Sequence, residues 1–140
     1  MLGYPNPRLT YFVDTDASKD RVGAVLSQIQ DGEERVIGYY SKTFTSPERN
    51  CCVTRRELLA VVKGVKHFRS YLYGQQFNLR TDYASFMWLR RRKEPSDQVA
   101  WWLETLAEFR YTLVHRAGLK HGNADGLSRR PAENAGSARR

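Results

Sequence analysis

The chain has 140 residues, which suffices for one domain with a substantial core. Its composition, 41% hydrophobic and 27% charged, is typical of a globular domain, and no apolar run reaches membrane-spanning length. Lys and Arg outnumber Asp and Glu by 23 to 15, which gives a net charge of +8. Because the basic residues run through the body of the chain, they favour a polyanionic partner such as nucleic acid over a solubilising role.

The two cysteines, Cys51 and Cys52, are adjacent in the sequence. Adjacent cysteines rarely form a disulfide, and no Cys/His spacing typical of a zinc site occurs. Residues 1–10 lack the apolar core of a signal peptide. These features predict a reducing, intracellular setting and no membrane association.

The first third of the chain predicts an antiparallel meander. Residues 1–7 hold two prolines and a glycine and are expected to be a linker. Residues 9–16, 21–30 and 34–41 are rich in strand-forming residues, and Asp31-Gly32 is a hairpin turn signal. Three strands joined by short turns make the meander.

A long amphipathic helix is predicted over residues 54–74, after a short helical turn that begins at Ser46. Its apolar residues recur at three- and four-residue steps. Thr54 is the expected N-cap, with Glu57 completing a capping box, and Gly74 ends the helix. Glu57 also lies on the apolar face of this helix, so it is either a first-turn cap or one member of a carboxylate cluster.

The remaining chain predicts a strand over residues 75–81, helices over 84–92 and 97–109, a strand over 110–115 and a helix over 123–130. Trp101 lies off the apolar stripe of its helix, and we expect partial burial against a loop rather than a partner contact. The element order predicts an α/β fold with a five-stranded mixed sheet, in which the meander is joined by parallel strands and flanked by helices. The domain is expected to cover residues 8–131, with a disordered tail over 132–140.

Four acids stand at the ends of predicted elements. If the first and fourth strands are parallel neighbours, their terminal acids emerge at one sheet edge, and the main helix can bring its glutamate between them. Converging carboxylates repel each other unless cations lie between them, and hard divalent ions such as Mg²⁺ suit oxygen ligands. Each acid alone could be a turn or cap residue, so the joint placement is the signal. The four acids are Asp16, Glu57, Asp82 and Asp125.

Several longer stretches carry a family resemblance: DTDASKDRVGAVLSQ, ERVIGYYSKTF, ERNCCVTRRELLAVVKGVKHFRSYLYG, FNLRTDYAS and HRAGLKHGNADGLSRRP. From about residue 8 to 131, the chain resembles the RNase H domain of gypsy-type long-terminal-repeat retrotransposon reverse transcriptases, part of the Pol polyprotein. The resemblance implies the RNase H-like fold and an endonuclease that hydrolyses the RNA strand of RNA–DNA hybrids during reverse transcription. It places the metal-binding, catalytic carboxylates on the same four acids.

The resemblance further implies two Mg²⁺ ions, for which Mn²⁺ can substitute, and products with a 3′-hydroxyl and a 5′-phosphate. Asp16 would contact both ions, Glu57 and Asp82 the ion near the leaving group, and Asp125 the ion that activates water. It implies an upstream polymerase domain in the same polyprotein as partner, and a cytoplasmic location in virus-like particles. We expect the phosphates of the hybrid to contact the basic stretch Arg90, Arg91, Arg92 and Lys93.

The chain departs from the family pattern at three positions. Tyr83 stands where the family usually has His, Trp101 where it has Arg, and Gly126 where it has Ala. A histidine near the metals could relay protons. With Tyr83 in that place, His115 or His121 would have to substitute, or the role is absent.

Three alternative functions compete with this interpretation. The domain could be a catalytically weak or inactive module that serves a structural or interaction role in a reverse transcriptase or a host protein. A retroviral-type integrase would require a late catalytic Glu and a zinc-binding arm, and the chain has neither. A passive nucleic-acid binder would give no reason for Glu57 on an apolar face.

Overall fold

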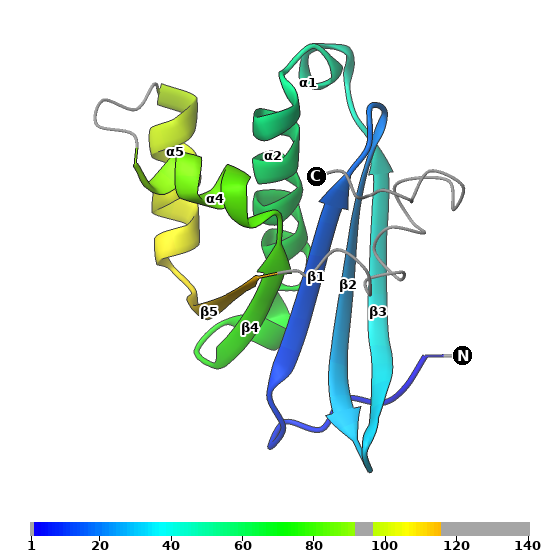
Figure 1. The fold of residues 1–140 in the computed structure, drawn as a ribbon. Coiled ribbons are helices and arrows are strands. Elements are labelled where there is room, and N and C mark those ends of the chain that lie inside the picture. Colours follow the sequence, from blue (N-terminus) through cyan, green and yellow to red (C-terminus); the bar gives the residue numbers. More distant parts are fainter. Residues whose placement is uncertain (1, 92–96, 116–140) are drawn as a thin grey trace.

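The computed structural model describes residues 2–91 and 97–115 (Figure 1). They form a five-stranded sheet of strand order β3-β2-β1-β4-β5 with helices on it. The α/β class and the mixed sheet are confirmed. The elements are β1 (Tyr11–Ala17), β2 (Arg21–Gln30), β3 (Glu33–Thr43), α1 (Ser46–Arg49), α2 (Val53–His67), α3 (Arg69–Leu72), β4 (Gln76–Thr81), α4 (Tyr83–Arg90), α5 (Asp97–Ala107) and β5 (Arg110–His115).

The sheet combines an antiparallel meander with a parallel half. β2 pairs antiparallel with both β1 and β3, whereas β4 pairs parallel with both β1 and β5. Asp31 and Gly32 have φ of 55° and 81°, which is the backbone that a tight two-residue hairpin turn needs. The predicted hairpin and the parallel β1–β4 pair are therefore confirmed.

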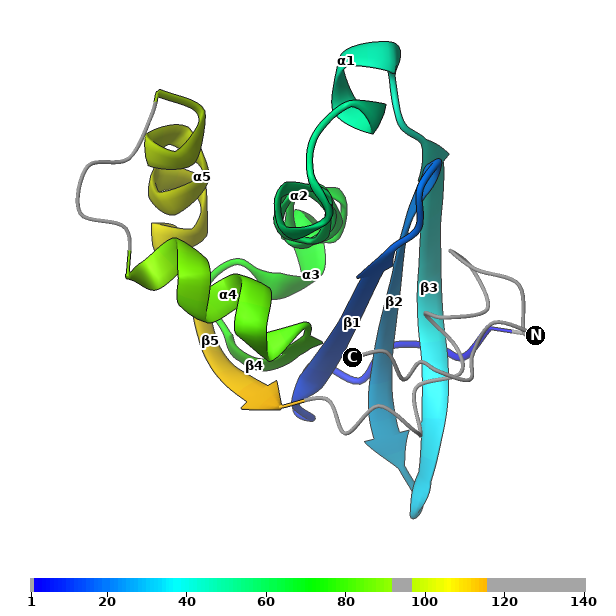
Figure 2. The same cartoon turned by 45° about the horizontal axis from the view of Figure 1, so that its top comes forward.

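Helices α2, α4 and α5 lie on one face of the sheet (Figures 1 and 2). The main core forms between this face and the helices, and it includes Val13, Leu26, Val61, Phe77 and Trp102. In β4, alternate residues Phe77, Leu79 and Thr81 are buried on the helix side. No helix in the described ranges is long and apolar enough to cross a membrane.

The predicted main helix differs in two respects. It ends at His67, and the separate turn α3 follows after Phe68, whose ψ of 19° departs from helical backbone while its side chain is buried. Thr54 is not the N-cap: Cys52 takes that position without a side-chain cap bond. A capping box does exist, but on α1, where Thr45 and Glu48 exchange side-chain-to-backbone hydrogen bonds.

Gly64 is a point of close contact between α2 and the sheet. A Cβ atom there would lie 3.0 Å from Ala24 Cβ and 3.3 Å from Thr15 Cγ2. The missing side chain therefore lets α2 pack directly on β1 and β2. Glycine is unfavourable inside a helix, so this position exchanges helix propensity for close packing.

The residues before β1 lie along the meander. Gly3 donates its backbone N–H to Val36 O at 2.7 Å, and Asn6 donates its own to Gln28 Oε1 at 2.9 Å.

The predicted helix over residues 123–130 and the predicted tail over 132–140 lie outside the described residues.

We expect Gly64→Val to lower the free energy of unfolding by about 1–3 kcal/mol, because the added methyl groups would overlap Ala24 and Thr15. Urea denaturation checks this value. Glu104→Ala on the exposed side of α5 is the control and should change stability by less than about 0.5 kcal/mol. An unchanged Gly64→Val protein would show that α2 can move away from the sheet at no cost.

Candidate active site

Asp16 and Asp82 lie at the same end of the β1–β4 pair. The parallel register pairs Asp14 with Arg80, and each strand places its acid two residues further on. Asp16 is fully buried, and its Oδ1 accepts a hydrogen bond from the backbone N–H of Ala17. Asp82 is the N-cap of α4, where its Oδ1 accepts from Ser85 N at 3.1 Å. The topology thus places two acids at neighbouring strand ends.

Glu57 comes to this region from α2. It lies seven residues before Gly64, which is about 10 Å along the helix and within about 20° around it. It therefore belongs to the stripe that packs on β1 and β2. Its side chain is buried, with 5% relative exposure. The N-terminal end of α2, the part of the helix that carries Glu57, lies beside the carboxyl end of β1 (Figure 1).

In the described part of the chain, His, Cys, Asp and Glu side chains form no group of three or more that could hold a metal ion. Asp16 and Asp82 each bind a neighbouring backbone N–H, and repulsion between carboxylates disfavours a closer approach without a cation. The donor chemistry fits Mg²⁺, because all three side chains offer oxygen ligands. The fourth predicted ligand, Asp125, lies outside the described residues.

A charged cluster that the sequence reasoning missed lies on the other face of the sheet. Arg80 Nε donates to Asp14 Oδ1, and Nη2 donates to Asp14 Oδ2 at 3.2 Å and to Glu34 Oε2 at 2.7 Å. Burial alone would lower the pKa of Arg80, but the two carboxylates outweigh burial, so the pKa is raised and the guanidinium stays charged. Asp14 and Arg80 carry opposite charges, and each precedes a strand-end acid by two residues. The sequence therefore contained a signal for this ion pair.

The predicted accessory residues have different positions. Tyr83 is the first residue of α4, directly after Asp82, and its side chain is 42% exposed. His115 ends β5, and its backbone pairs with Thr81 next to Asp82. The backbone of His115 thus lies at the same end of the sheet as the acids, whereas His121 lies outside the described residues.

Of the predicted basic stretch, Arg90 and Arg91 are described. Arg90 ends α4 and Arg91 is its C-cap, and both are exposed. Arg90 also lines an open groove of about 510 Å³ together with Arg110, Phe86 and Tyr111. Burial raises the pKa of Tyr111, and the charge of Arg90 acts in the opposite direction. Arg92 and Lys93 lie outside the described residues.

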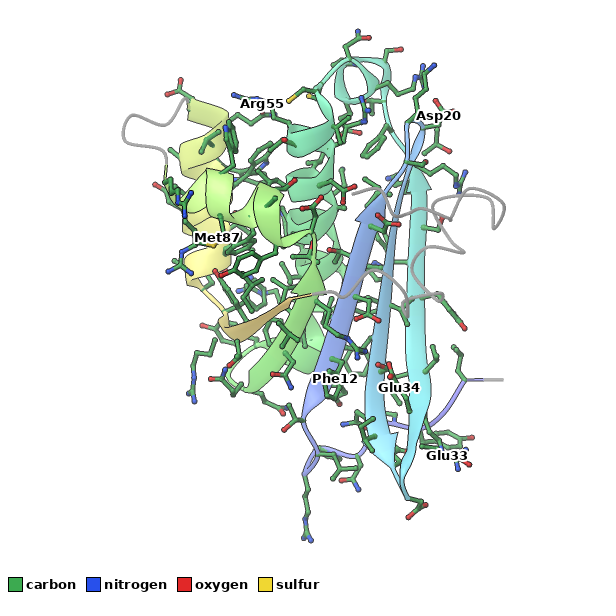
Figure 3. All side chains as sticks on the ribbon, viewed as in Figure 1. Phe12, Asp20, Glu33, Glu34, Arg55 and Met87 are labelled. Atoms are coloured by element: carbon green, nitrogen blue, oxygen red, sulfur yellow. The ribbon has the colours of Figure 1, made fainter. Side chains whose placement is uncertain are left out.

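Aromatic and cationic side chains meet on the outer side of the helices. Lys66 Nζ of α2 lies 4.7 Å from the ring centroid of Trp101, which is 46% exposed. The expected partial burial of Trp101 against a loop is therefore wrong, because the side chain is exposed and contacts a lysine of α2. Arg55 links α2 to α5 (Figure 3) by donating to Gln98 Oε1 at 2.7 Å. A cation–π pair such as that of Lys66 and Trp101 contributes about 0.5–1 kcal/mol at an exposed site.

Comparison with known proteins identifies relatives. The family of the RNase H-like domain found in reverse transcriptase matches residues 6–109. The retrovirus-related Pol polyprotein from transposon 412 of Drosophila melanogaster is 35% identical over 129 residues. That match covers 92% of this chain and 10% of the relative, so the chain spans about a tenth of the relative's length.

Solved structures share the fold. The foamy viral protease-reverse transcriptase in complex with dsDNA aligns with a TM-score of 0.71 at 21% identity, over 86% of this chain and 26% of the other. An RNase H1 isolated from compost aligns with a TM-score of 0.62 at 14% identity, over 84% of this chain and 91% of the other. The predicted RNase H-like fold is therefore confirmed.

The cap at Asp82 yields a stability prediction. Asp82→Ala should lower the free energy of unfolding by about 1 kcal/mol, because α4 loses the bond to Ser85 N. Asp82→Asn should change it by less than about 0.5 kcal/mol, because Asn caps helices as well as Asp does. Urea denaturation of both variants checks this, and equal losses would mean that the negative charge, not the cap, stabilises α4.

Proposed function

Because this chain belongs to the family of RNase H-like domains found in reverse transcriptase, we propose that it hydrolyses the RNA strand of RNA–DNA hybrids. This proposal is supported chiefly by the position of Asp16 and Asp82 at adjacent strand ends, with buried Glu57 on the helix stripe that packs on β1 and β2. A buried carboxylate costs free energy unless it is neutralised or compensated by charge or hydrogen bonds. Three acids placed this way support metal-dependent phosphodiester hydrolysis.

Asp16, Glu57 and Asp82 would hold divalent cations, together with Asp125 from the region beyond the described residues. Their oxygen-only donor set favours Mg²⁺, with Mn²⁺ as a substitute. Two such ions, when bound, lower the pKa of the attacking water and stabilise charge on the leaving oxygen. The chain orients the carboxylates: Ser85 N–H holds the Asp82 side chain, and Ala17 N–H holds that of Asp16.

Arg90 and Arg91 would bind phosphates of the hybrid. Arg90 lies eight residues after Asp82, which places it about 12 Å away along α4. A duplex that reaches the carboxylates can therefore extend over the end of this helix. Phosphate contacts supply affinity without sequence preference, as suits an enzyme that must act along a whole hybrid.

The domain would act beside a polymerase domain of the same polyprotein, since the chain corresponds to about a tenth of the transposon 412 Pol polyprotein. We place it in the cytoplasm within virus-like particles. A second candidate is a weakly active or inactive module that serves a structural role. Tyr83 in the usual His position favours this candidate, because it removes an imidazole that could relay protons there.

The decisive assay incubates the domain with an RNA–DNA hybrid labelled on the RNA strand. We expect RNA cleavage in Mg²⁺ or Mn²⁺ and none in chelator. Asp82→Asn should reduce the rate at least about a hundredfold, because one metal ligand loses its charge while the helix cap remains.

The matched control is Asp97→Asn, which makes the same chemical change on an exposed acid in the first turn of α5. It should cleave at the wild-type rate. Binding of the hybrid without cleavage in any metal would favour the inactive module, and loss in both variants would mean that global charge, not the site, sets the rate.

Arg90 gives a test of substrate binding. Arg90→Gln should weaken hybrid binding severalfold and reduce the slope of log K against log salt by about 0.9, the value for one lost phosphate contact in a duplex. Fluorescence anisotropy over a salt series measures both quantities. Arg35→Gln, on β3 at the opposite edge of the sheet, should change neither, and equal effects of the two variants would mean nonspecific charge attraction.

A further inference from the structure

Two side-chain links join β1 and β4 immediately before the strand-end acids. Asp14 and Arg80 form a two-point ion pair at one register position. At the next position, Thr15 Oγ1 donates to Thr81 Oγ1 at 2.8 Å. Thr15 faces α2, and alternation places Asp14 on the opposite face, so one link lies on each side of the sheet. Asp16 and Asp82 follow directly.

The guanidinium of Arg80 is held from several directions. Besides Asp14, it contacts Glu34, whose Oε2 also accepts from Ser27 Oγ at 2.8 Å. Its carbon lies 4.5 Å from the Phe12 ring centroid. Figure 3 shows Phe12 and Glu34 close together on the sheet. Because Arg80 contacts side chains of β1 and β3, its position on β4 is tied to the whole meander.

A constraint of this kind answers a physical problem at the site. Asp16 and Asp82 are like charges at adjacent strand ends, and their repulsion tends to separate β1 from β4. The paired backbone register of β1 and β4 ends at Asp14 and Arg80, so side-chain links act where the backbone ladder stops. A partly buried bidentate ion pair of this kind is directional, and removing one partner leaves the charge of the other poorly compensated.

We propose that Asp14 and Arg80 are positioning residues, whose ion pair fixes the spacing of β1 and β4 at the strand ends where Asp16 and Asp82 would hold the metal. This inference rests on the proposed function and deepens it. The two residues act through the carboxylates, so they should affect metal binding and turnover rather than substrate affinity. A purely stabilising pair would instead affect unfolding alone.

The test compares Asp14→Asn, Arg80→Gln, Arg80→Lys and the Asp14→Asn/Arg80→Gln double variant with the wild type. Thr112→Val is the matched control, since it removes the 2.7 Å bond from Gln76 Nε2 to Thr112 Oγ1 between β4 and β5. That link is also a cross-strand bond of a parallel pair, but it lies at the opposite end of β4 from Asp82. Readouts are kcat, KM, and the rise in melting temperature on adding Mg²⁺ without substrate.

We expect Asp14→Asn and Arg80→Gln to need about tenfold more Mg²⁺ for the melting-temperature rise and to lose about tenfold or more in kcat, with KM nearly unchanged. The double variant should be no worse than the poorer single variant, because both remove one interaction. Arg80→Lys keeps the positive charge but not the two-point geometry of the guanidinium, so its loss in kcat and in Mg²⁺ response should be smaller than that of Arg80→Gln. Thr112→Val should keep the wild-type Mg²⁺ response.

Other outcomes separate this inference from the proposed function. If the wild type cleaves and the variants only melt earlier, with unchanged kcat and Mg²⁺ response, the pair merely stabilises and the inference is wrong. If the wild type binds Mg²⁺ but does not cleave, the proposed function fails and the melting shifts alone decide the positioning role. If the wild type neither cleaves nor responds to Mg²⁺, both are wrong.

Discussion

The close packing of α2 on β1 and β2 governs the geometry of the proposed site. Gly64 permits this approach, because any side chain there would press on Ala24 and Thr15. Glu57 shares its helix stripe, so the distance that Gly64 sets also determines how near Glu57 comes to the end of β1. With a wider spacing between helix and sheet, the core would still be apolar, but the carboxylate of Glu57 would lie farther from the strand ends.

The two faces of the sheet contribute in different ways. The helix face supplies apolar packing and the buried Thr15–Thr81 bond, whereas the other face carries the ion pair of Asp14 and Arg80. The charges of Asp14 and Arg80 thus compensate each other directly beside the acids of the proposed site. Functional sites commonly combine well-ordered surroundings with like charges that repel each other, and they lose some stability as a result.

The strands were predictable because their signals are local. The Asp31-Gly32 turn and the apolar patterns placed all five strands within a few residues, and the parallel pair followed from the intervening helix. The helix break at Phe68 was not predictable, because no Gly or Pro marks it and the burial of Phe68 is a tertiary effect. The N-cap of α2 was not predictable either, because Cys52 takes that position without the side-chain hydrogen bond that typical N-cap residues make.

The candidate site was predictable only in part. Strand-end position and apolar-face position identified Asp16, Glu57 and Asp82, and the family resemblance gave them a chemistry. The Asp14–Arg80 pair could have been found from opposite charges on parallel neighbours. The contact of Arg80 with Glu34 could not, because it depends on how far one side chain reaches across the sheet. Asp125 and its helix stay predictions.

The links between β1 and β4 also bear on how the chain folds. Each joins residues 66 positions apart, so closing that loop costs about 4 kcal/mol of chain entropy, by (3/2)RT ln n, before any contact compensates it. The meander and α2 involve shorter separations and can form earlier. We therefore expect the strand end that carries Asp82 to join the one that carries Asp16 late in folding, so that an incompletely folded chain lacks the paired strand ends of the proposed site.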